Sequence, residues 1–222
     1  MNTMISELAC DALLFDLDGV LIDSSACIAR NWQAWAEPHG IDVTQIMKVA
    51  HGVRSVETIR QVAPHLDAEQ EAAKLTALEV ADTDGVIAMP GAHALLRALP
   101  ANAWTIVTSG NAALAEARLL AVGLPIPAAI VTADDVTEGK PAPEPYLLGA
   151  ERLGLAPERC LVVEDAPAGI QAGRGPGIRV LGISSTHARD KLLDNGATVV
   201  VDRLADLVVV NAAGGYPLVV RW

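Results

Sequence analysis

Two carboxylates placed two residues apart, Asp16 and Asp18, are the side chains in this sequence best positioned to do chemistry. They follow the apolar residues 13–15 and precede Gly19, a pattern typical of a buried strand that ends in a turn. In open α/β sheets, ligands bind beyond the carboxyl ends of the strands, which is where Asp16 would then lie. An Asp-x-Asp pair is more often a solvated loop or a helix cap. It therefore indicates a cation site with a nucleophilic carboxylate only if other segments supply the missing groups.

Three later segments, each following a predicted strand, supply the groups that such a site lacks. The first offers a hydroxyl and free backbone N–H groups, which bind an anion or cap a helix; it comprises Thr108, Ser109, Gly110 and Asn111. The second carries Lys140 between a glycine and prolines, which restrict an otherwise solvated loop lysine. The third places Glu164 and Asp165 after the apolar residues 160–163 and so repeats the first pattern. Each segment is a weak signal, but their order along the chain makes the set specific.

The elements that must position these residues alternate between strand and helix from residue 90 onward. Strands are predicted at 103–108, 128–132, 160–163, 179–183 and 198–201, and helices at 91–99, 111–122, 143–153, 166–174 and 188–195. This alternation predicts an α/β fold with a Rossmann-like, mostly parallel sheet flanked by helices. The segments 207–210 and 218–221, on either side of the glycine-rich residues 213–215, predict a terminal hairpin.

Residues 24–82 have helical periodicity and contain no predicted strand, although the first strand precedes them. Ser24 is predicted to cap a helix that runs to about residue 37, and a second amphipathic helix is predicted at 67–82. We therefore expect a small α-helical cap domain, 23–89, inserted into an α/β core formed by 1–22 and 90–222. The break between cap helices at His51, Gly52 and Arg54 is either an ordinary turn or a loop that faces the site.

Composition excludes several classes of partner. The chain has 222 residues, 51% of them hydrophobic, and a formal net charge of −11, which argues against nucleic acid because phosphates are bound by Lys and Arg. No run of about 18 apolar residues is present, so no membrane span is expected. The N-terminal residues have no signal-peptide pattern. Three scattered cysteines without a Cys-x-x-Cys motif are typical of reduced thiols in a cytoplasmic protein.

The four segments resemble, in order and spacing, the four motifs of the haloacid dehalogenase superfamily of phosphatases. They read FDLDGVLIDS, TIVTSG, GKPAPEPY and VVEDAPAGI, and the resemblance covers roughly residues 13–183. It is greatest to sugar phosphatases and glycerol-phosphate phosphatases with a helical (C1-type) cap, which also have a His-Gly break in the cap and VTSG in the second motif. The segment RGPG at 174–177 departs from the alanine-rich helix end usual in the family. It lies beyond the chemistry and bears on stability more than on mechanism.

The resemblance implies a Mg2+-dependent phosphatase that hydrolyses small phosphorylated sugars or polyols through an aspartyl-phosphate. Asp16 would attack phosphorus, and Asp18 would act as general acid and base. The implied catalytic residues are Asp16, Asp18, Thr108 and Lys140. The implied substrate-binding residues are Ser109, Gly110, Asn111, His51, Gly52 and Arg54. The implied metal ligands are Asp16, Asp18 (through its carbonyl), Asp165 and, through water, Glu164. The partner would be a small phosphorylated metabolite, bound by a cytoplasmic monomer or weak homo-oligomer.

A sugar phosphomutase of the β-phosphoglucomutase type has the same four motifs and is the main alternative. Those mutases carry a histidine ten residues after the second aspartate, where this chain has Ile28, which favours hydrolysis. A dehalogenase would need neither Asp18 nor Asp165, and a P-type pump would need membrane spans. A catalytically silent binding module is expected only if a motif residue is lost, and all are present.

Overall fold

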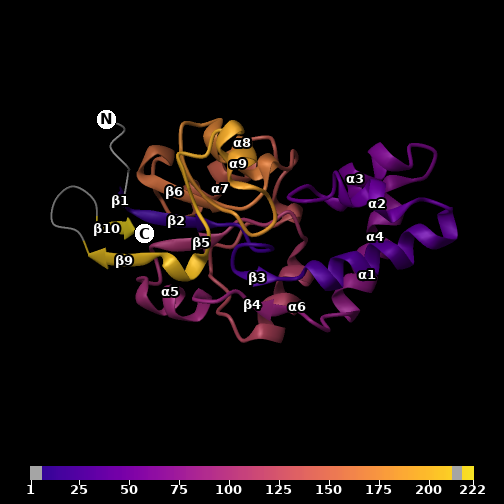
Figure 1. The fold of residues 1–222 in the computed structure, drawn as a ribbon, viewed down its shortest axis with the longest axis horizontal. Helices are drawn as coiled ribbons and strands as arrows, with labels where there is room; N and C mark the ends of the chain where they lie inside the picture. Colours follow the sequence, from indigo (N-terminus) through magenta and orange to yellow (C-terminus); the bar gives the residue numbers. More distant parts are fainter. Residues whose placement is uncertain (1–6, 212–216) are drawn as a thin grey trace.

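The computed structural model describes residues 7–211 and 217–222, and it consists of a sheet-containing part and a helical part (Figure 1). The central sheet has the strand order β5-β2-β6-β7-β8, and all four strand pairs are parallel. Its strands are β5 (Trp104–Ile106), β2 (Ala12–Phe15), β6 (Cys160–Glu164), β7 (Arg179–Ile183) and β8 (Val199–Val201). The α/β fold with a mostly parallel sheet that the sequence predicts is therefore confirmed.

Alternating side chains of the sheet enter two hydrophobic clusters. Leu13 and Phe15 of β2 belong to one cluster, together with Leu119, whereas Leu14 belongs to the other, together with Ile170. This alternation is expected because successive side chains of a strand point to opposite faces. The helices of this part are α5 (Ala92–Ala98), α6 (Ala112–Val122), α7 (Glu144–Arg152), α8 (Pro167–Arg174) and α9 (Arg189–Asp194). They cover the sheet and bury its strands, as parallel sheets require.

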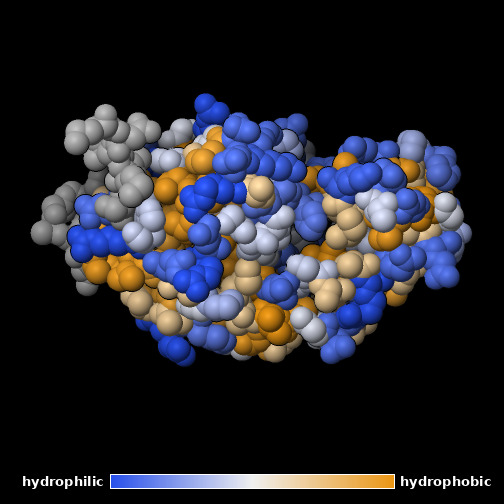
Figure 2. Space-filling view, in the orientation of Figure 1, coloured by the Kyte–Doolittle hydropathy of each residue, from blue (hydrophilic) through white to orange (hydrophobic). Residues whose placement is uncertain are grey.

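The helical part contains α1 (Ser25–Ala36), α2 (Val43–Met47), α3 (Ser55–Val62) and α4 (Ala68–Ala81). These helices bury a third cluster of their own, which includes Trp32, Trp35, Ile46, Ile59 and Leu75. The chain enters this part through β3 (Ile22–Asp23) and returns through β4 (Ile87–Ala88), which pair as a short antiparallel ribbon. The visible face of both parts is a mixture of hydrophilic and hydrophobic residues (Figure 2).

Three features of the sheets differ from the sequence-based predictions. Instead of a strand at 128–132, only Val131 bridges to Val107, because Pro125 and Pro127 precede it and a short 3₁₀ helix, Ala133–Asp135, follows. The strand β1 (Glu7–Cys10) was not predicted. It pairs with β10 (Leu218–Arg221), which in turn pairs with β9 (Val208–Asn211). The predicted pairing of the two C-terminal segments is thus confirmed, whereas the turn at 213–215 lies outside the described residues.

The prediction that Ser24 is the N-cap residue of α1 is confirmed, but its side chain makes no capping hydrogen bond. Ser24 occupies the N-cap position, but its hydroxyl donates instead to Asp18 Oδ1 at 2.5 Å. The first free N–H group of the helix, that of Ser25, is satisfied by Asp23 Oδ1 at 3.0 Å. A neighbouring aspartate therefore releases Ser24 to bind the second aspartate of the first motif.

Two further findings concern membrane-spanning helices and the state of the cysteines. Within the described residues, no helix combines the length and apolar character needed to cross a bilayer. Cys10, Cys27 and Cys160 are buried free thiols. Burial raises the pKa of Cys10 to about 12 and that of Cys160 to about 11, so both are inert as nucleophiles at neutral pH.

Gly169 of α8 gives a test of how closely this helix packs on β6. A Cβ atom at Gly169 would lie 1.6 Å from Oε1 of Glu164, a buried carboxylate at the end of β6. We expect Gly169→Ala to lower the free energy of unfolding by about 1–3 kcal/mol, since this overpacking must displace Glu164 or the helix. Chemical denaturation measures the change. Gly175→Ala is the control, because its Cβ would meet nothing closer than 3.3 Å, and an equal loss for both variants would contradict the close approach.

Candidate active site

The predicted site residues meet at the carboxyl ends of three adjacent parallel strands. Asp16 follows β2, Thr108 lies two residues beyond β5, and Glu164 ends β6 with Asp165 directly after it. The pairing of Phe15 with Ile106 and Val163 puts these ends at one edge of the sheet. Asp16 N then donates to the Val163 carbonyl at 3.0 Å, which continues the pairing of β2 and β6 into the site.

Lys140 lies beneath this edge and binds two of the carboxylates. Its Nζ donates to Asp16 Oδ1 at 2.7 Å, to Glu164 Oε1 at 2.8 Å and to the Val107 carbonyl at 3.0 Å. All three donors of the ammonium are thus used, although the side chain is only 1% exposed. Burial opposes its charge, but the Asp16 and Glu164 carboxylates outweigh burial and raise the pKa of Lys140. The lysine predicted from a loop motif is therefore a buried, fully bonded cation.

Glu164 is held by four donors. Its Oε1 accepts from Lys140 and from the Tyr146 hydroxyl at 2.9 Å, and its Oε2 accepts from the N–H groups of Asp165 and Ala166 at 2.8 and 2.9 Å. With two donors on each oxygen, Glu164 fixes Lys140 and the turn after β6. Tyr146 was missed by the sequence analysis, although it lies within the third motif, GKPAPEPY.

Asp16, Glu164 and Asp165 form a buried cluster of carboxylates whose oxygens lie within 4.8 Å of one another. Burial raises the pKa of Asp16 to about 7; Lys140 lowers this pKa and Glu164 raises it further. Burial, together with the charges of Glu164 and Asp16, also raises the pKa of Asp165. Three carboxylates thus face one ammonium, an imbalance that a divalent cation would offset.

The geometry of the cluster fits a hard cation with oxygen ligands. Lys140 binds Asp16 Oδ1 and Thr186 binds Asp165 Oδ2, whereas the other oxygen of each aspartate accepts no hydrogen bond within the described residues. Gly19 is required beside them, since its Cβ would lie 2.1 Å from Asp165 Oδ2 and its φ is +84°. Carboxylate oxygens in this arrangement are the ligands that Mg2+ and Ca2+ prefer.

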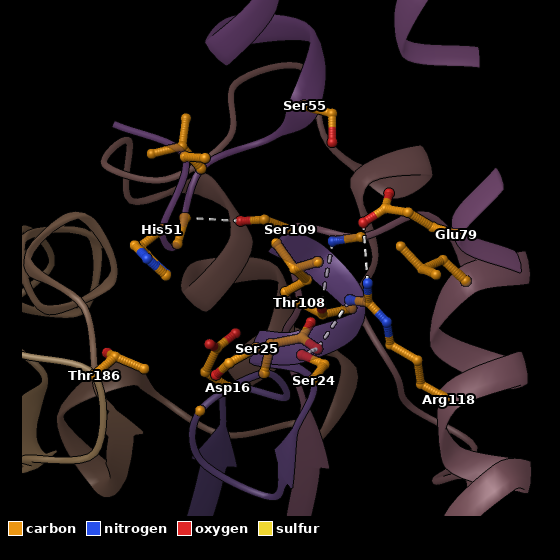
Figure 3. Close-up of a pocket in the computed structure, with 18 of the residues that line it drawn as sticks. Asp16, Ser24, Ser25, His51, Ser55, Glu79, Thr108, Ser109, Arg118 and Thr186 are labelled. Atoms are coloured by element: carbon orange, nitrogen blue, oxygen red, sulfur yellow. Dashed lines mark hydrogen bonds and ion pairs between the residues drawn. The ribbon is translucent and has the colours of Figure 1, made fainter. Parts of the chain in front are cut away.

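Asp18 is bound by groups from both parts of the molecule. Its Oδ1 accepts from the Ser24 hydroxyl and, at 2.9 Å, from Nη1 of Arg118 in α6. Nη2 of the same guanidinium donates to Oε1 of Glu79 in α4 at 3.0 Å (Figure 3). The sequence analysis missed Arg118 and Glu79. The signal for Arg118 was its position four residues after Leu114, on the buried face of α6.

The turn after β5 provides groups that can bind an anion. The side chain of Thr108 is buried, and its Oγ1 accepts from the Gly110 N–H at 3.1 Å. The Ser109 N–H has no partner within the described residues, while the Ser109 hydroxyl donates to the Gly52 carbonyl of the helical part at 3.0 Å. Asn111 caps α6 by accepting from Leu114 N at 2.9 Å and does not line the pocket. Of the predicted anion-binding residues, the structure therefore brings Thr108, Ser109 and Gly110 to the pocket.

A pocket with an empty volume of about 770 Å³, its mouth included, separates these groups from the helical part. Asp16 lies at its base, and Ser55 and Glu79 lie across the pocket on α3 and α4 (Figure 3). His51 and Gly52 of the predicted cap loop also line it.

Arg54 of the cap loop lies outside the residues that line the pocket. Its guanidinium binds the Glu57 carboxylate and donates to the carbonyls of Val136 and Thr137 at 3.3 and 3.0 Å. It also packs against Gly139, where a Cβ would lie 2.6 Å from Arg54 Nε. The expectation that Arg54 contacts a substrate is therefore not supported by its position, and the residue instead joins the helical part to the loop that carries Lys140.

His51 packs edge to face against His187, with ring centroids 5.7 Å apart. Burial, followed by the charge of Lys191, lowers the pKa of His51 below its ordinary value. His51 is thus neutral at neutral pH and can offer a hydrogen bond to a bound ligand, but not a positive charge.

The arrangement can therefore bind a tetrahedral anion and attack it. Asp16 supplies a carboxylate with one free oxygen, and Asp18 supplies a second carboxyl group two residues further on. Lys140 supplies positive charge, and the Thr108 hydroxyl and the Ser109 N–H supply hydrogen-bond donors, which are the groups that stabilise spreading phosphoryl charge.

Comparisons with known proteins agree with this geometry. A family model described as haloacid dehalogenase-like hydrolase matches residues 10–177. Hexitol phosphatase A of Escherichia coli (strain K12) is 39% identical over 211 residues, which cover 93% of this chain and 97% of that protein. Glycerol-1-phosphate phosphohydrolase 2 of Saccharomyces cerevisiae is 35% identical over 229 residues, which cover 97% and 90%. The family resemblance of the four motifs is thus confirmed.

A solved structure of β-phosphoglucomutase from Clostridium difficile has the same fold. It superposes with a TM-score of 0.75 at 25% sequence identity and covers 88% of this chain and 92% of that one.

Removing Lys140 tests whether its ammonium balances the buried carboxylates. We expect Lys140→Met to lower the free energy of unfolding by about 3–5 kcal/mol at pH 8 in the presence of a chelator, since Asp16 and Glu164 then lose their buried partner. The loss should be smaller at pH 5.5, because carboxyl groups with raised pKa values take up protons there. Thermal and denaturant unfolding measure both values. Lys48→Met, at an exposed lysine, should cost less than about 0.5 kcal/mol; equal losses for the two variants would contradict the role of Lys140.

Proposed function

The chain belongs to the haloacid dehalogenase-like hydrolases, and we propose that it is a Mg2+-dependent phosphatase of small phosphorylated sugars or polyols. The observation that carries this proposal is the free carboxylate oxygen of Asp16, which lies at the base of a pocket beside Lys140 and Asp165. The substrate class is supported by the names of two relatives, a hexitol phosphatase and a glycerol-1-phosphate phosphohydrolase, which align with this chain over more than 90% of its length.

In the first step Asp16 attacks the phosphorus atom of the bound ester. A P–O bond forms to the Asp16 carboxylate as the P–O bond to the leaving group breaks. The protonated carboxyl group of Asp18 gives its proton to the leaving oxygen, so that an alcohol departs and Asp18 becomes a carboxylate. Lys140, the Thr108 hydroxyl and the Ser109 N–H stabilise the charge on the phosphoryl oxygens.

In the second step water attacks the aspartyl-phosphate. The Asp18 carboxylate accepts a proton from this water as its oxygen bonds to phosphorus, and the P–O bond to Asp16 breaks. Inorganic phosphate leaves, Asp16 regains its charge and Asp18 its proton. The two aspartates are thereby returned to their starting states.

The residues that would hold Mg2+ are Asp16 and Asp165, with the backbone carbonyl of Asp18 as a further oxygen ligand. Bound there, the cation would neutralise the repulsion between the nucleophile and the anionic substrate. Glu164, whose oxygens already accept four hydrogen bonds, would act by fixing Lys140 and the turn at Asp165.

Residues 23–89 are proposed to act as a cap domain over the core formed by 1–22 and 90–222. The support is the separate hydrophobic cluster of α1 to α4 and the set of contacts that these helices and their loop make across the pocket. These contacts join Ser109 to Gly52, Arg118 to Glu79, and Arg54 to the carbonyl of Thr137. A cap held in this position excludes bulk water from the reaction.

Hydrolysis is favoured over phosphomutase chemistry by the side chain at position 28. Ile28 lines the pocket, where the mutases of this family carry a histidine. An aliphatic side chain can neither donate nor accept a proton. Water is therefore the phosphoryl acceptor that the pocket supports.

Three buried free thiols support the further proposal that the enzyme is cytoplasmic.

A panel of phosphorylated hexitols, glycerol phosphates and sugar phosphates, assayed for phosphate release with Mg2+, tests the function. We expect kcat/KM to be higher for at least one of them than for 4-nitrophenyl phosphate. Asp16→Asn should abolish turnover, because an amide does not act as the nucleophile, while thermal unfolding shows a folded protein. Near-normal phosphate release by Asp16→Asn would exclude the proposed mechanism. Isomerisation of a sugar phosphate without phosphate release would instead identify a mutase.

The pKa values of the carboxylate cluster predict how cation binding depends on pH. Between pH 5.5 and 8, metal-free Asp16, with a pKa near 7, loses its proton, and the stability that its raised pKa contributes at low pH is lost. Mg2+ binds only the ionised cluster, so its stabilisation should be larger at pH 8, reaching about 2.7 kcal/mol at a concentration 100 times Kd.

Thermal unfolding with chelator and with Mg2+, at both pH values, measures this difference. Other groups that titrate in this range, including His51 and His187, contribute to both measurements and cancel in the difference. An equal Mg2+ effect at pH 5.5 and pH 8 would contradict binding at the cluster. Asp165→Asn is the matched variant and should lose most of the effect.

A further inference from the structure

A chain of three ionisable side chains runs from the first motif to the helical part. Arg118 of α6 donates through Nη1 to Asp18 at 2.9 Å and through Nη2 to Glu79 of α4 at 3.0 Å (Figure 3). The side chains of Arg118 and Glu79 are 3% and 5% exposed. The guanidinium therefore connects a group proposed to transfer the proton with a helix of the proposed cap.

The contacts among Asp18, Arg118 and Glu79 fix which oxygen of Asp18 is free to face a substrate. The Ser24 hydroxyl and Arg118 Nη1 both donate to Oδ1, whereas Oδ2 accepts no hydrogen bond within the described residues. A carboxyl group held through one oxygen presents the other in a defined direction. Since Asp18 lines the pocket together with Asp16, this direction decides whether its proton can reach a leaving group.

Stability alone does not account for an arginine at this position. Its neighbours on the buried face of α6 are Leu114, Ala115 and Leu119, so an apolar residue would continue that face. Arg118 is buried instead at the cost of its hydration, and its Nε has no hydrogen-bond partner within the described residues. Buried ion pairs of this kind often add little net stability compared with apolar side chains, which indicates a role in geometry.

Resting on the proposed function, we propose that Arg118 is a positioning residue that aims the Asp18 carboxyl group at the leaving oxygen, and that Glu79 makes this aim depend on cap closure. The step affected is the transfer of the Asp18 proton to the leaving oxygen as its bond to phosphorus breaks. Movement of α4 away from the core separates Glu79 from Arg118 and releases the guanidinium. Proton transfer is then supported only while the cap covers the substrate.

Two esters of similar size separate this role from a merely structural one. Benzyl phosphate needs a proton on its leaving oxygen, whereas 4-nitrophenolate leaves without one. Because kcat/KM reports the step that forms the aspartyl-phosphate, we expect Arg118→Met to lower it by about 100-fold or more for benzyl phosphate and by less than about 5-fold for 4-nitrophenyl phosphate. Arg118→Lys, which keeps the charge and can bind Asp18, should recover part of the loss.

Glu79→Gln tests the connection to the cap. The amide keeps a hydrogen-bond acceptor for Arg118 but loses the charge, so we expect the same selective loss on benzyl phosphate with a smaller size. Combined with Arg118→Met, it should add nothing further, since Glu79 acts through Arg118. Glu116→Gln, at an exposed position on α6, the helix that carries Arg118, is the control and should leave kcat/KM for both esters unchanged.

Equal losses on both esters, or no loss on either, would overturn the positioning role. If thermal unfolding shows that Arg118→Met does not fold, Arg118→Lys and Glu79→Gln give the same decision on folded protein. A wild-type enzyme that releases phosphate from no ester, aryl or polyol, would refute the proposed phosphatase function itself. That outcome is distinct from an active wild type whose variants lose both esters equally.

Discussion

The excess of buried negative charge around Lys140 is the constraint on which the rest of this structure depends. One ammonium is shared by Asp16 and Glu164, and Asp165 lies in the same cluster. Glu164 remains buried because four donors fill its oxygens, and α8 approaches it so closely that only glycine fits at position 169. The remaining imbalance is the one that the proposed Mg2+ would offset.

The overall charge makes this local arrangement necessary. A chain with a formal net charge of −11 repels an anionic metabolite at long range, although salt screens that repulsion beyond about 8 Å. Attraction must therefore come from groups at the pocket itself, which are Lys140, the Ser109 N–H and the proposed Mg2+.

The sequence predicted the sheet edge well and the connections across the molecule poorly. The sequence alone predicted that four residues lie close together, because parallel strands end at one edge of a sheet. They are Asp16, Thr108, Lys140 and Asp165. Arg118 and Glu79 lie in ordinary helical sequence, and only the tertiary fold reveals that they bind one another. Arg54 was predicted to face the pocket because it lies in a polar break between helices. Its long side chain instead reaches the carbonyls of Val136 and Thr137 and donates to them. The strand expected at 128–132 does not form, because two prolines precede it.

The ribbon of β3 and β4 has a consequence for how such enzymes can diversify. Because Ile22 pairs with Ala88, the two ends of the insertion leave the core side by side. A segment whose ends are adjacent can be lengthened, shortened or exchanged while the parallel sheet keeps its register. If the helical part acts as the proposed cap, the residues that would contact the leaving group can change independently of the sheet edge, except where Arg118 reaches across to Glu79. A helical part exchanged from another protein would have to supply an acidic residue for Arg118 at the place of Glu79.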